Sequence, residues 1–348
     1  SGREGRSSLK LSIVDQCPVP EGFTPADALR NTIDLAKLAD RLGYERYWIA
    51  EHHATGSFAS SAPEIMIARV AAETRHIRVG SGGVMLPHYS PLKVAEVFRM
   101  LHALYPGRID LGIGRAPGGS PLDTFALRRD RNNRVMPDDF PQQMAELMAF
   151  LSASFPDEHP FREIALSPAM PGGPDLWLLG SSMWSAAAAA QFGVPYAFAH
   201  FIDPTHTRKA IEYYREHVNR SADAMAGQTI LAVGAICAET EEAAHRLYSS
   251  VRAWAQRLRQ GGGRGPIPTP ERALTQIGST YGRLPNDSGE WPRVFVGDAE
   301  HLHGELARIS GELHIDEIMI VTVVHDHQAR RRSYALLAEA FGLKPREV

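Results

Sequence analysis

Cysteine is scarce in this sequence, and no long uninterrupted hydrophobic segment is present. Cys17 and Cys237 are the only two cysteines in 348 residues, which is too few for a disulfide framework and favours a reducing compartment. The most apolar stretch, residues 176–200, is interrupted by Gly, Ser, Gln and Pro and does not predict a membrane span. Residues 1–8 lack the apolar segment of a signal peptide and are interpreted as a disordered tail or an expression remnant. We expect a cytoplasmic protein with no membrane partner.

Charge of one sign is not in excess either, which argues against a nucleic-acid partner. The chain has 37 Lys and Arg against 40 Asp and Glu, a formal net charge of −3, with no acidic tail. Apolar residues make up 44% of the chain, enough for a sizeable core, and no internal repeat is visible. Since α/β barrels are the usual single-domain fold at this length, residues 9–348 are interpreted as one domain.

Short apolar runs alternate along the chain with longer helical patterns. Eight runs predict strands, at residues 9–14, 46–50, 77–85, 108–113, 175–179, 195–200, 229–238 and 317–324. Their alternation with helices is typical of an α/β fold and predicts a closed (β/α)8 TIM barrel with insertions after strands four and seven. The rival fold, an open doubly wound sheet, is disfavoured because no GxGxxG motif follows the first strand.

Polar side chains follow the second strand, where the active site of a parallel barrel would lie. In the sequence Glu51-His52-His53, strand alternation places Trp48, Ala50 and His52 on one face. If that face points inward, His52 reaches the mouth of the site as a general acid or base, or as a donor to a cofactor ring. Two satisfied histidines in a βα loop remain an equal alternative.

Two glycines inside the third strand also call for an explanation. Glycine weakens a strand unless another backbone or a flat ligand comes close to it. Gly82 and Gly83 therefore fit a flat ring lying against this strand, and they fit a bulge or tight packing in the barrel equally well.

A serine-rich segment opens a helix directly after the fifth strand. Gly180 precedes Ser181, Ser182 and Ser185, and free N–H groups with the helix dipole make such a position an anion site. The alternative is an ordinary N-cap, since serine is a preferred capping residue. Arg115 follows the neighbouring fourth strand and could chelate a phosphate, although a lone arginine is more often in a surface salt bridge. The serines and Arg115 together favour the phosphate.

The sequence His325-Asp326-His327 could form a metal or acid/base cluster near the eighth strand. A metal needs three or four converging ligands, and no HExxH or CxxC motif accompanies these residues. We therefore predict no metal site, and the role of this segment stays open.

Four stretches, taken together in order and spacing, resemble the bacterial-luciferase-like, flavin-dependent monooxygenase family. They are GYERYWIAEHHATG at 43–56, RVGSGGVMLPHYSPLKVAE at 78–96, YPGRIDLGIGRAPG at 105–118 and LLGSSMWSAAAAAQFGVPYAF at 178–198. The resemblance extends from Leu9 to Leu343. Luciferases carry a reactive cysteine where this chain has Gly114, so the resemblance is to the non-luminescent branch. That branch tends to end its eighth strand with a segment like VVHDH, which gives His325 and its neighbours a family-specific role.

The resemblance implies a barrel that binds flavin mononucleotide (FMN). It makes His52 the catalytic residue and implies a non-proline cis peptide at Gly82-Gly83, beside the flavin ring. The residues that it places at the cofactor are Glu51, Gly82, Gly83, Arg115, Gly180, Ser181, Ser182 and Ser185.

The activity that the resemblance implies is a two-component monooxygenase. A separate flavin reductase supplies reduced FMN, O2 forms a C4a-hydroperoxyflavin, and a small organic substrate is oxidised while the protein excludes water. Loops at residues 116–136 and 261–292 are expected to act as lids, and the chain to form a homodimer. The alternatives are hydride transfer with a deazaflavin, and a flavin-binding protein without turnover.

Overall fold

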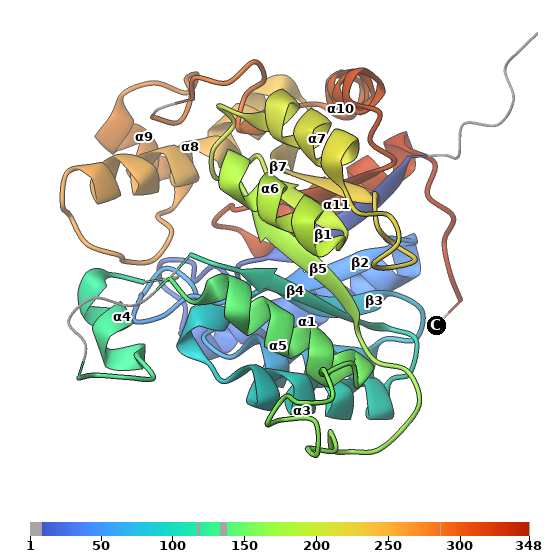
Figure 1. Cartoon of the computed structure of the whole chain (residues 1–348). Coiled ribbons are helices and arrows are strands. Elements are labelled where there is room, and N and C mark those ends of the chain that lie inside the picture. The colour runs from blue at the N-terminus through green and yellow to red at the C-terminus, as the bar shows by residue number, and fades with distance from the viewer. Residues whose placement is uncertain (1–8, 117–118, 133–137, 286, 348) are drawn as a thin grey trace, which may run out of the picture.

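The strands of the computed structural model form one parallel sheet, and eight of them close into a ring (Figure 1). The structure describes residues 9–116, 119–132, 138–285 and 287–347, so the tail predicted at residues 1–8 lies outside it. The ring strands are β1 (Lys10–Asp15), β2 (Arg46–Ile49), β3 (Arg78–Met85), β4 (Ile109–Gly114), β5 (Asp175–Gly180), β6 (Tyr196–Ala199), β7 (Thr229–Cys237) and β9 (Glu317–Val321). The β6–β7, β7–β9 and β9–β1 pairings close the ring, which confirms the TIM barrel.

Most of the helices cover the outside of the ring (Figure 1). The helices are α1 (Pro25–Leu42), α2 (Pro63–Glu73), α3 (Pro91–Leu104), α4 (Pro121–Leu127), α5 (Phe140–Ser152), α6 (Met183–Phe192), α7 (Thr207–His217), α8 (Glu241–Arg259), α9 (Pro270–Ile277), α10 (Ala299–Leu313) and α11 (His327–Ala340). Of these, α4 and α9 lie to one side of the ring. The helix ends follow local chemistry. In α1, for example, Thr24 and Asp27 form a capping box, and Gly43 ends the helix with a φ of 92°. No helix in the described ranges is both long and apolar enough to cross a membrane.

The two insertions contain structure that the sequence did not reveal. Helix α4 lies in the first insertion, and helix α9 lies in the second, where a loop was expected. A ninth strand, β8 (Val294–Gly297), pairs with the last part of β7, from Gly234 to Cys237. The first part of β7 in chain order, from Leu231 to Gly234, pairs with β9, and the last part pairs with β8. Strand β7 therefore has two partners in succession on one side.

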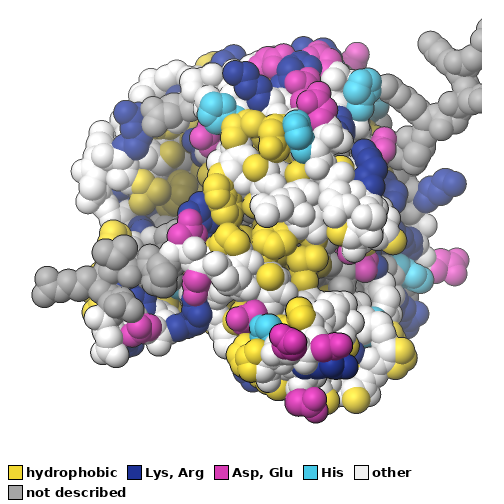
Figure 2. All heavy atoms as spheres, viewed as in Figure 1, with side chains coloured by type: hydrophobic (Ala, Val, Ile, Leu, Met, Phe, Trp, Pro, Cys, Tyr) yellow, Lys and Arg dark blue, Asp and Glu magenta, His cyan; other side chains and the backbone are white. Residues whose placement is uncertain are grey.

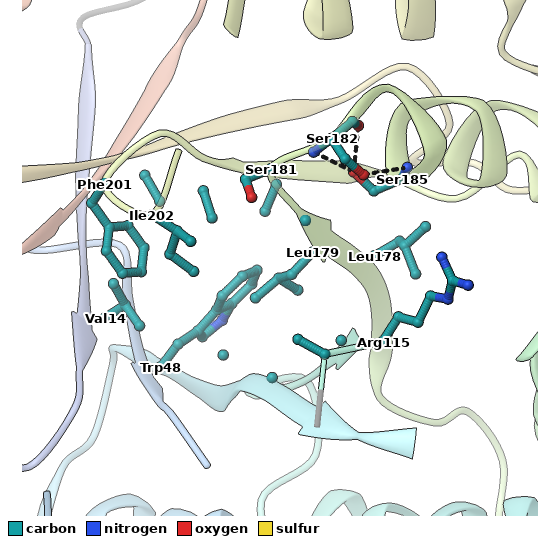
Figure 3. Close-up of a pocket in the computed structure, with 18 of the residues that line it drawn as sticks. Val14, Trp48, Arg115, Leu178, Leu179, Ser181, Ser182, Ser185, Phe201 and Ile202 are labelled. Atoms are coloured by element: carbon teal, nitrogen blue, oxygen red, sulfur yellow. Dashed lines mark hydrogen bonds between the residues drawn. The ribbon is translucent and has the colours of Figure 1, made fainter. Parts of the chain in front are cut away.

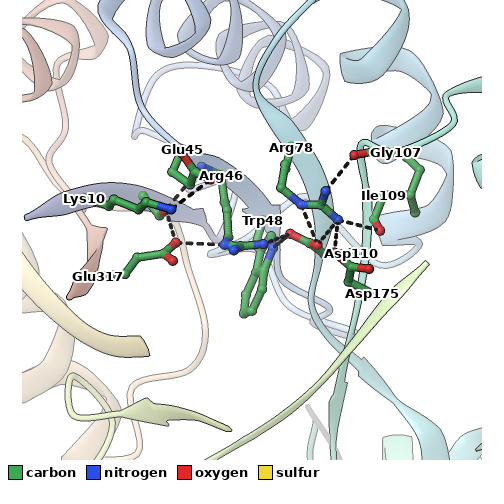
Figure 4. Close-up of polar contacts among 11 residues, drawn as sticks. Lys10, Glu45, Arg46, Trp48, Arg78, Gly107, Ile109, Asp110, Asp175 and Glu317 are labelled. Carbon is green, nitrogen blue, oxygen red and sulfur yellow. Dashed lines mark hydrogen bonds and ion pairs between the residues drawn. The ribbon is translucent and has the colours of Figure 1, made fainter. Parts of the chain in front are cut away.

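Charged side chains fill the amino-terminal end of the barrel (Figure 4). Arg46 donates from Nε to Glu317 at 2.8 Å and from Nη1 to Asp110 at 2.9 Å, and all three side chains are buried. Arg78 pairs with the other oxygen of Asp110 at 2.7 Å. Burying these charges is tolerated because each has a partner of opposite sign. Asp110 also accepts the indole N–H of Trp48 at 2.9 Å, which fixes this inward-facing ring.

Candidate functional site

A cavity of about 450 Å³ opens at the carboxyl ends of the strands, and we call it the main cavity. Its floor consists of inward-facing side chains from the ring, including Val14, Trp48 and Met319, and its sides come from the segments that follow β3, β4, β5 and β6 (Figure 3). It brings together seven of the residues that the sequence places at a cofactor: Gly82, Gly83, Arg115, Gly180, Ser181, Ser182 and Ser185.

Glycines form a flat part of the wall. The peptide bond between Gly82 and Gly83 is cis, as the resemblance implies. A Cβ atom on Gly82 would lie 3.0 Å from Cβ of Trp48 and 3.2 Å from Cγ2 of Val14, and one on Gly114 would lie 3.0 Å from Cε of Met85. Side chains at these positions would crowd their neighbours, so bare backbone faces the cavity and a flat group can approach it.

The serine segment forms the opposite side, at the start of α6. Ser182 is the N-cap, and its Oγ accepts the N–H of Ser185 at 3.2 Å. The hydroxyl of Ser185 is buried, donates to the carbonyl of Ser182 at 2.7 Å and lies 2.7 Å from the hydroxyl of Tyr196. Ser181 points into the cavity, and its hydroxyl bonds to no described residue (Figure 3). The N-cap is thus confirmed, and the anion site stays a prediction: Ser185 bonds within the start of the helix, while Ser181 faces the cavity.

Arg115 lies across the cavity mouth from these serines (Figure 3). Its guanidinium carbon is 4.0 Å from the ring centroid of Trp184, the second residue of α6, and its Nη2 is 2.9 Å from Asp138. The arginine and Asp138 side chains are 43% and 60% exposed, so the ion pair contributes little stability and can be exchanged for another anion. Stacking on an indole orients the guanidinium without occupying its N–H donors.

Glu51 does not line the main cavity. Its carboxylate is 2% exposed and accepts the backbone N–H of Met85 at 2.9 Å and the hydroxyl of Tyr89, and it lies 2.6 Å from Nε2 of His53. These partners hold the end of β3 and the segment after it. A direct contact between Glu51 and a cofactor stays a prediction.

His52 is not part of the lining of the main cavity. Its ring centroid is 4.7 Å from that of Phe58, and its Nδ1 atom is buried without a hydrogen-bond partner among the described residues. Burial lowers the pKa of His52 to about 4 against the opposing attraction of Glu51, so the ring is neutral at pH 7. A catalytic role for His52 stays a prediction.

The segment from His325 to His327 makes contacts that hold the fold together. Nε2 of His325 bonds to the carbonyl of Glu21 at 2.8 Å, Asp326 is the N-cap of α11, and His327 bonds to Asp34 at 2.7 Å. In the part of the chain that the structure describes, no group of three or more His, Cys, Asp or Glu side chains is placed to hold a metal.

The two insertions expected to act as lids contact each other. Nη1 of Arg264, in the second insertion, lies 3.5 Å from Asp123 at the start of α4 in the first. The backbone of Arg264 also accepts the N–H of Gly56 at 2.8 Å. Residues 117–118 and 133–137 of the first insertion lie outside the described ranges, and the lid role of both insertions stays a prediction.

Sequence reasoning missed several residues of the site. Trp184 is the most informative, because it stands between the serines that were identified and yet its contact is with Arg115. Phe201 and Ile202, two and three residues after the end of β6, also line the main cavity. Their position after a strand indicates that both could line the site, but an apolar residue type does not indicate a chemical role.

Solved structures resemble this fold over nearly its whole length. The structure of apo-MsnO8 is 48% identical, covers 97% of this chain and 100% of its own, and superposes with a TM-score of 0.90. Two distant structures share the fold alone. One is the oxygenating constituent of 3,6-diketocamphane monooxygenase from Pseudomonas putida in complex with FMN, at 18% identity, TM-score 0.69 and coverages of 98% and 100%. The other is an F420-dependent secondary alcohol dehydrogenase, at 14% identity, TM-score 0.68 and coverages of 96% and 99%.

The amino-acid sequence also has curated relatives. N-acetyl-S-alkylcysteine monooxygenase of Bacillus subtilis (strain 168) is 37% identical over 336 residues, which are 95% of this chain and 98% of that protein. A luciferase-like monooxygenase of Escherichia coli (strain K12) is 38% identical over 94% of this chain and 96% of its own length. The sequence profile of the luciferase-like monooxygenases matches residues 10–308. The chain, with its glycine-walled cavity at the carboxyl end of a parallel barrel, therefore belongs to the luciferase-like monooxygenase family.

Proposed function

We propose that this chain is a two-component monooxygenase that takes reduced FMN from a separate flavin reductase and uses it with O2 to oxidise a small organic substrate. The observation that carries the proposal is the meeting of Arg115 and the start of α6, 65 or more residues later in the chain, around one cavity. A cation, a helix N-terminus and a free hydroxyl on one cavity match the needs of a phosphate group.

The other walls fit the rest of FMN. The cavity volume of about 450 Å³ is in the range of small-molecule sites, and the backbone at Gly82, Gly83 and Gly114 leaves room for a flat ring. Arg115, Ser181 and Ser182 would hold the phosphate, and the glycines would face the ring. When bound, FMN supplies the redox chemistry, for which amino-acid side chains have no substitute.

The chain's own residues provide binding, orientation and exclusion of water. Val14, Trp48 and Met319 make the floor of the cavity apolar, which keeps water from the reacting atoms. His52 remains the candidate for proton movement, since its buried Nδ1 has no partner among the described residues. For that role the ring has to reach the site, past Phe58, when the cofactor and the substrate are bound.

The named relatives support a monooxygenase activity and leave hydride transfer with a deazaflavin as the alternative. The relative from Bacillus subtilis is a monooxygenase, and the distant structure from Pseudomonas putida contains FMN. Another distant structure depends on F420, a deazaflavin, so hydride transfer with such a cofactor is the alternative. Assembly as a homodimer in the cytoplasm completes the proposal, and sedimentation of the purified chain checks the assembly.

The test combines FMN binding with oxygen consumption. Arg115→Ala should weaken FMN binding by about 1.5–3 kcal/mol, or roughly 10- to 150-fold, the scale of a hydrogen bond to a charged group. Arg131→Ala is the matched control, because Arg131 belongs to the same insertion but bonds to the carbonyl of Ala126 outside the cavity. Unchanged affinity in Arg115→Ala would place the phosphate elsewhere.

The cofactor and the reaction class are decided with the wild-type chain. Mass spectrometry of the ligand released from purified protein separates FMN from a deazaflavin. Substrate-dependent oxygen uptake with FMN, NADH and a flavin reductase, followed by 18O labelling of the product, supports a monooxygenase. Binding of FMN with no turnover on any substrate would instead favour a flavin-binding protein.

A further inference from the structure

A second cavity of about 160 Å³ adjoins the main one, and we call it the side cavity. It shares Phe201 and Ile202 with the main cavity, and Ile202 is 56% exposed although its side chain is hydrophobic. Figure 2 shows a hollow with hydrophobic side chains between the α8–α9 segment and helices α6 and α7. Helix α8 and strand β8, which flank the second insertion, contribute Val251, Trp254, Ala255 and Val294 to the side cavity wall.

The two cavities follow one another along the same faces of two paired strands. On β7, Ala232 lines the main cavity, and Gly234, two residues further on, lines the side cavity. On β9, Met319 lines the main cavity and Val321 lines the side cavity. Ala232 pairs with Met319 and Gly234 with Val321. Because side chains alternate along a strand, these residues form one continuous inner surface that passes from one cavity into the other.

The side cavity offers a mainly aromatic and aliphatic surface. Phe58 and Trp254 lie edge to face with their centroids 5.5 Å apart. The indole N–H of Trp254 donates to Oγ of Ser57 at 3.0 Å, so this donor is satisfied by the protein and the ring is held in place. The remaining wall includes Val251 and Leu284, both buried.

The polar side chains of this wall do not favour an anionic occupant. They belong to Gln16 and Arg293. Nε of Arg293 donates to the carbonyl of Phe201 at 3.0 Å, and its backbone N–H donates to Asp287 at 2.9 Å. Because Nε of Arg293 already donates to a backbone carbonyl and the rest of the lining apart from Gln16 is apolar, an uncharged group fits this cavity better than a carboxylate or a phosphate.

We propose that the side cavity holds the apolar end of the substrate, an uncharged ring or branched alkyl group of about the size of benzene, while the reacting atom lies in the main cavity. An apolar cavity of about 150 Å³ binds benzene in a well-known engineered protein, and 160 Å³ is of that size. Trp254 and Ala255 limit the size of the group that enters. The proposal rests on the proposed function, since it gives that reaction its substrate class.

The test measures binding of toluene to the full chain with FMN in excess, by saturation-transfer NMR. Toluene is expected to bind to the wild type. Ala255→Leu places a larger side chain in the side cavity and should weaken toluene binding by about tenfold or more. Arg259→Leu introduces the same residue on the exposed side of α8 and should leave binding unchanged, which makes it the matched control.

A second variant enlarges the cavity. Trp254→Ala should shift the preference from toluene to naphthalene by about tenfold, because the larger hydrocarbon fills the space left by the indole. Toluene binding that survives Ala255→Leu, or is absent from the wild type both with and without FMN, overturns the proposal. Since binding is measured without turnover, a chain that binds toluene in this way but neither binds FMN nor consumes O2 would overturn the proposed function alone.

Discussion

The guanidinium of Arg115 stacks on the indole of Trp184, with its central carbon 4.0 Å from the ring centroid. Arg115 directly follows β4, Trp184 is the second residue of α6, and both side chains belong to residues that line the main cavity. The arginine is thereby held near the helix N-terminus before any anion arrives. Preorganisation of this kind increases affinity because less side-chain entropy is lost on binding.

Removing the indole should therefore weaken FMN binding. We expect Trp184→Ala to raise the Kd for FMN by about two- to fivefold, the scale of an exposed cation–π contact, and Trp184→Phe to restore most of the loss. Quenching of flavin fluorescence measures the Kd. Arg208→Ala is the control, because Arg208 stacks on Trp291 in the same way but lies outside the cavity. Wild-type affinity in Trp184→Ala would show that the stack does not prepare the site.

The serines at the start of α6 should separate into two kinds. Ser181→Ala removes a hydroxyl that faces the cavity, so FMN affinity should fall by about 0.5–1.5 kcal/mol with unchanged stability. Ser185→Ala removes a buried hydroxyl bonded to Ser182 and Tyr196, so the free energy of unfolding should fall by a similar amount. Urea unfolding and FMN titration of both variants check this. The same outcome for both serines would contradict the division.

A substitution of Glu51 can show whether this residue contacts the cofactor or supports the end of strand β3. Glu51→Gln keeps the shape but leaves only one carbonyl oxygen for Met85, Tyr89 and His53, so the free energy of unfolding should fall by about 1–3 kcal/mol. Glu45→Gln, which affects a partly exposed ion pair with Lys10, should change it by less than about 1 kcal/mol. A loss of FMN affinity without a loss of stability would instead indicate that Glu51 contacts the cofactor.

The lowered pKa of His52 predicts a loss of stability in acid. Its pKa is about 4 in the folded chain and 6.5 in the unfolded reference state. At a pH between these two values, His52 is protonated in the unfolded chain and neutral in the folded chain, so protons stabilise the unfolded state. Lowering the pH from 7 to 5 should therefore cost up to about 2 kcal/mol at this residue. His52→Gln should lose less stability over the same pH range in urea unfolding. Equal losses in both chains would show that His52 does not titrate in this way.

Most of the ring could be predicted because its strands combine apolar runs with clear endings. Strand β8 escaped detection because its four residues, Val294–Gly297, directly follow a loop rich in Gly and Pro, and only their pairing with β7 makes them a strand. Helix α9 was hidden by the Gly- and Pro-rich sequence around it, although Thr269 caps it in the usual way.

The site was predictable where it depends on strand ends and not where it depends on loops. Arg115 and the serines lie where the order of the strands puts them. His52 was expected to reach the cavity by strand alternation, but β2 ends at Ile49, so the alternation no longer governs its direction. Trp184 contacts Arg115 and Trp254 contacts Ser57, and both contacts join segments that are distant in sequence. No local sequence pattern predicts such contacts.

The β1–β9 ladder ties the first strand of the ring to the last, and Glu317 in β9 accepts the hydroxyl of Ser12 in β1 at 2.6 Å. During synthesis β1 leaves the ribosome some three hundred residues before its partner, so one of its edges stays unpaired until β9 has also been synthesised. Such an open edge is exposed to association with other chains. The dependence of folding on chaperones in the cell should therefore increase with this delay. It should decrease in a circular permutant in which β9 directly precedes β1 in the chain.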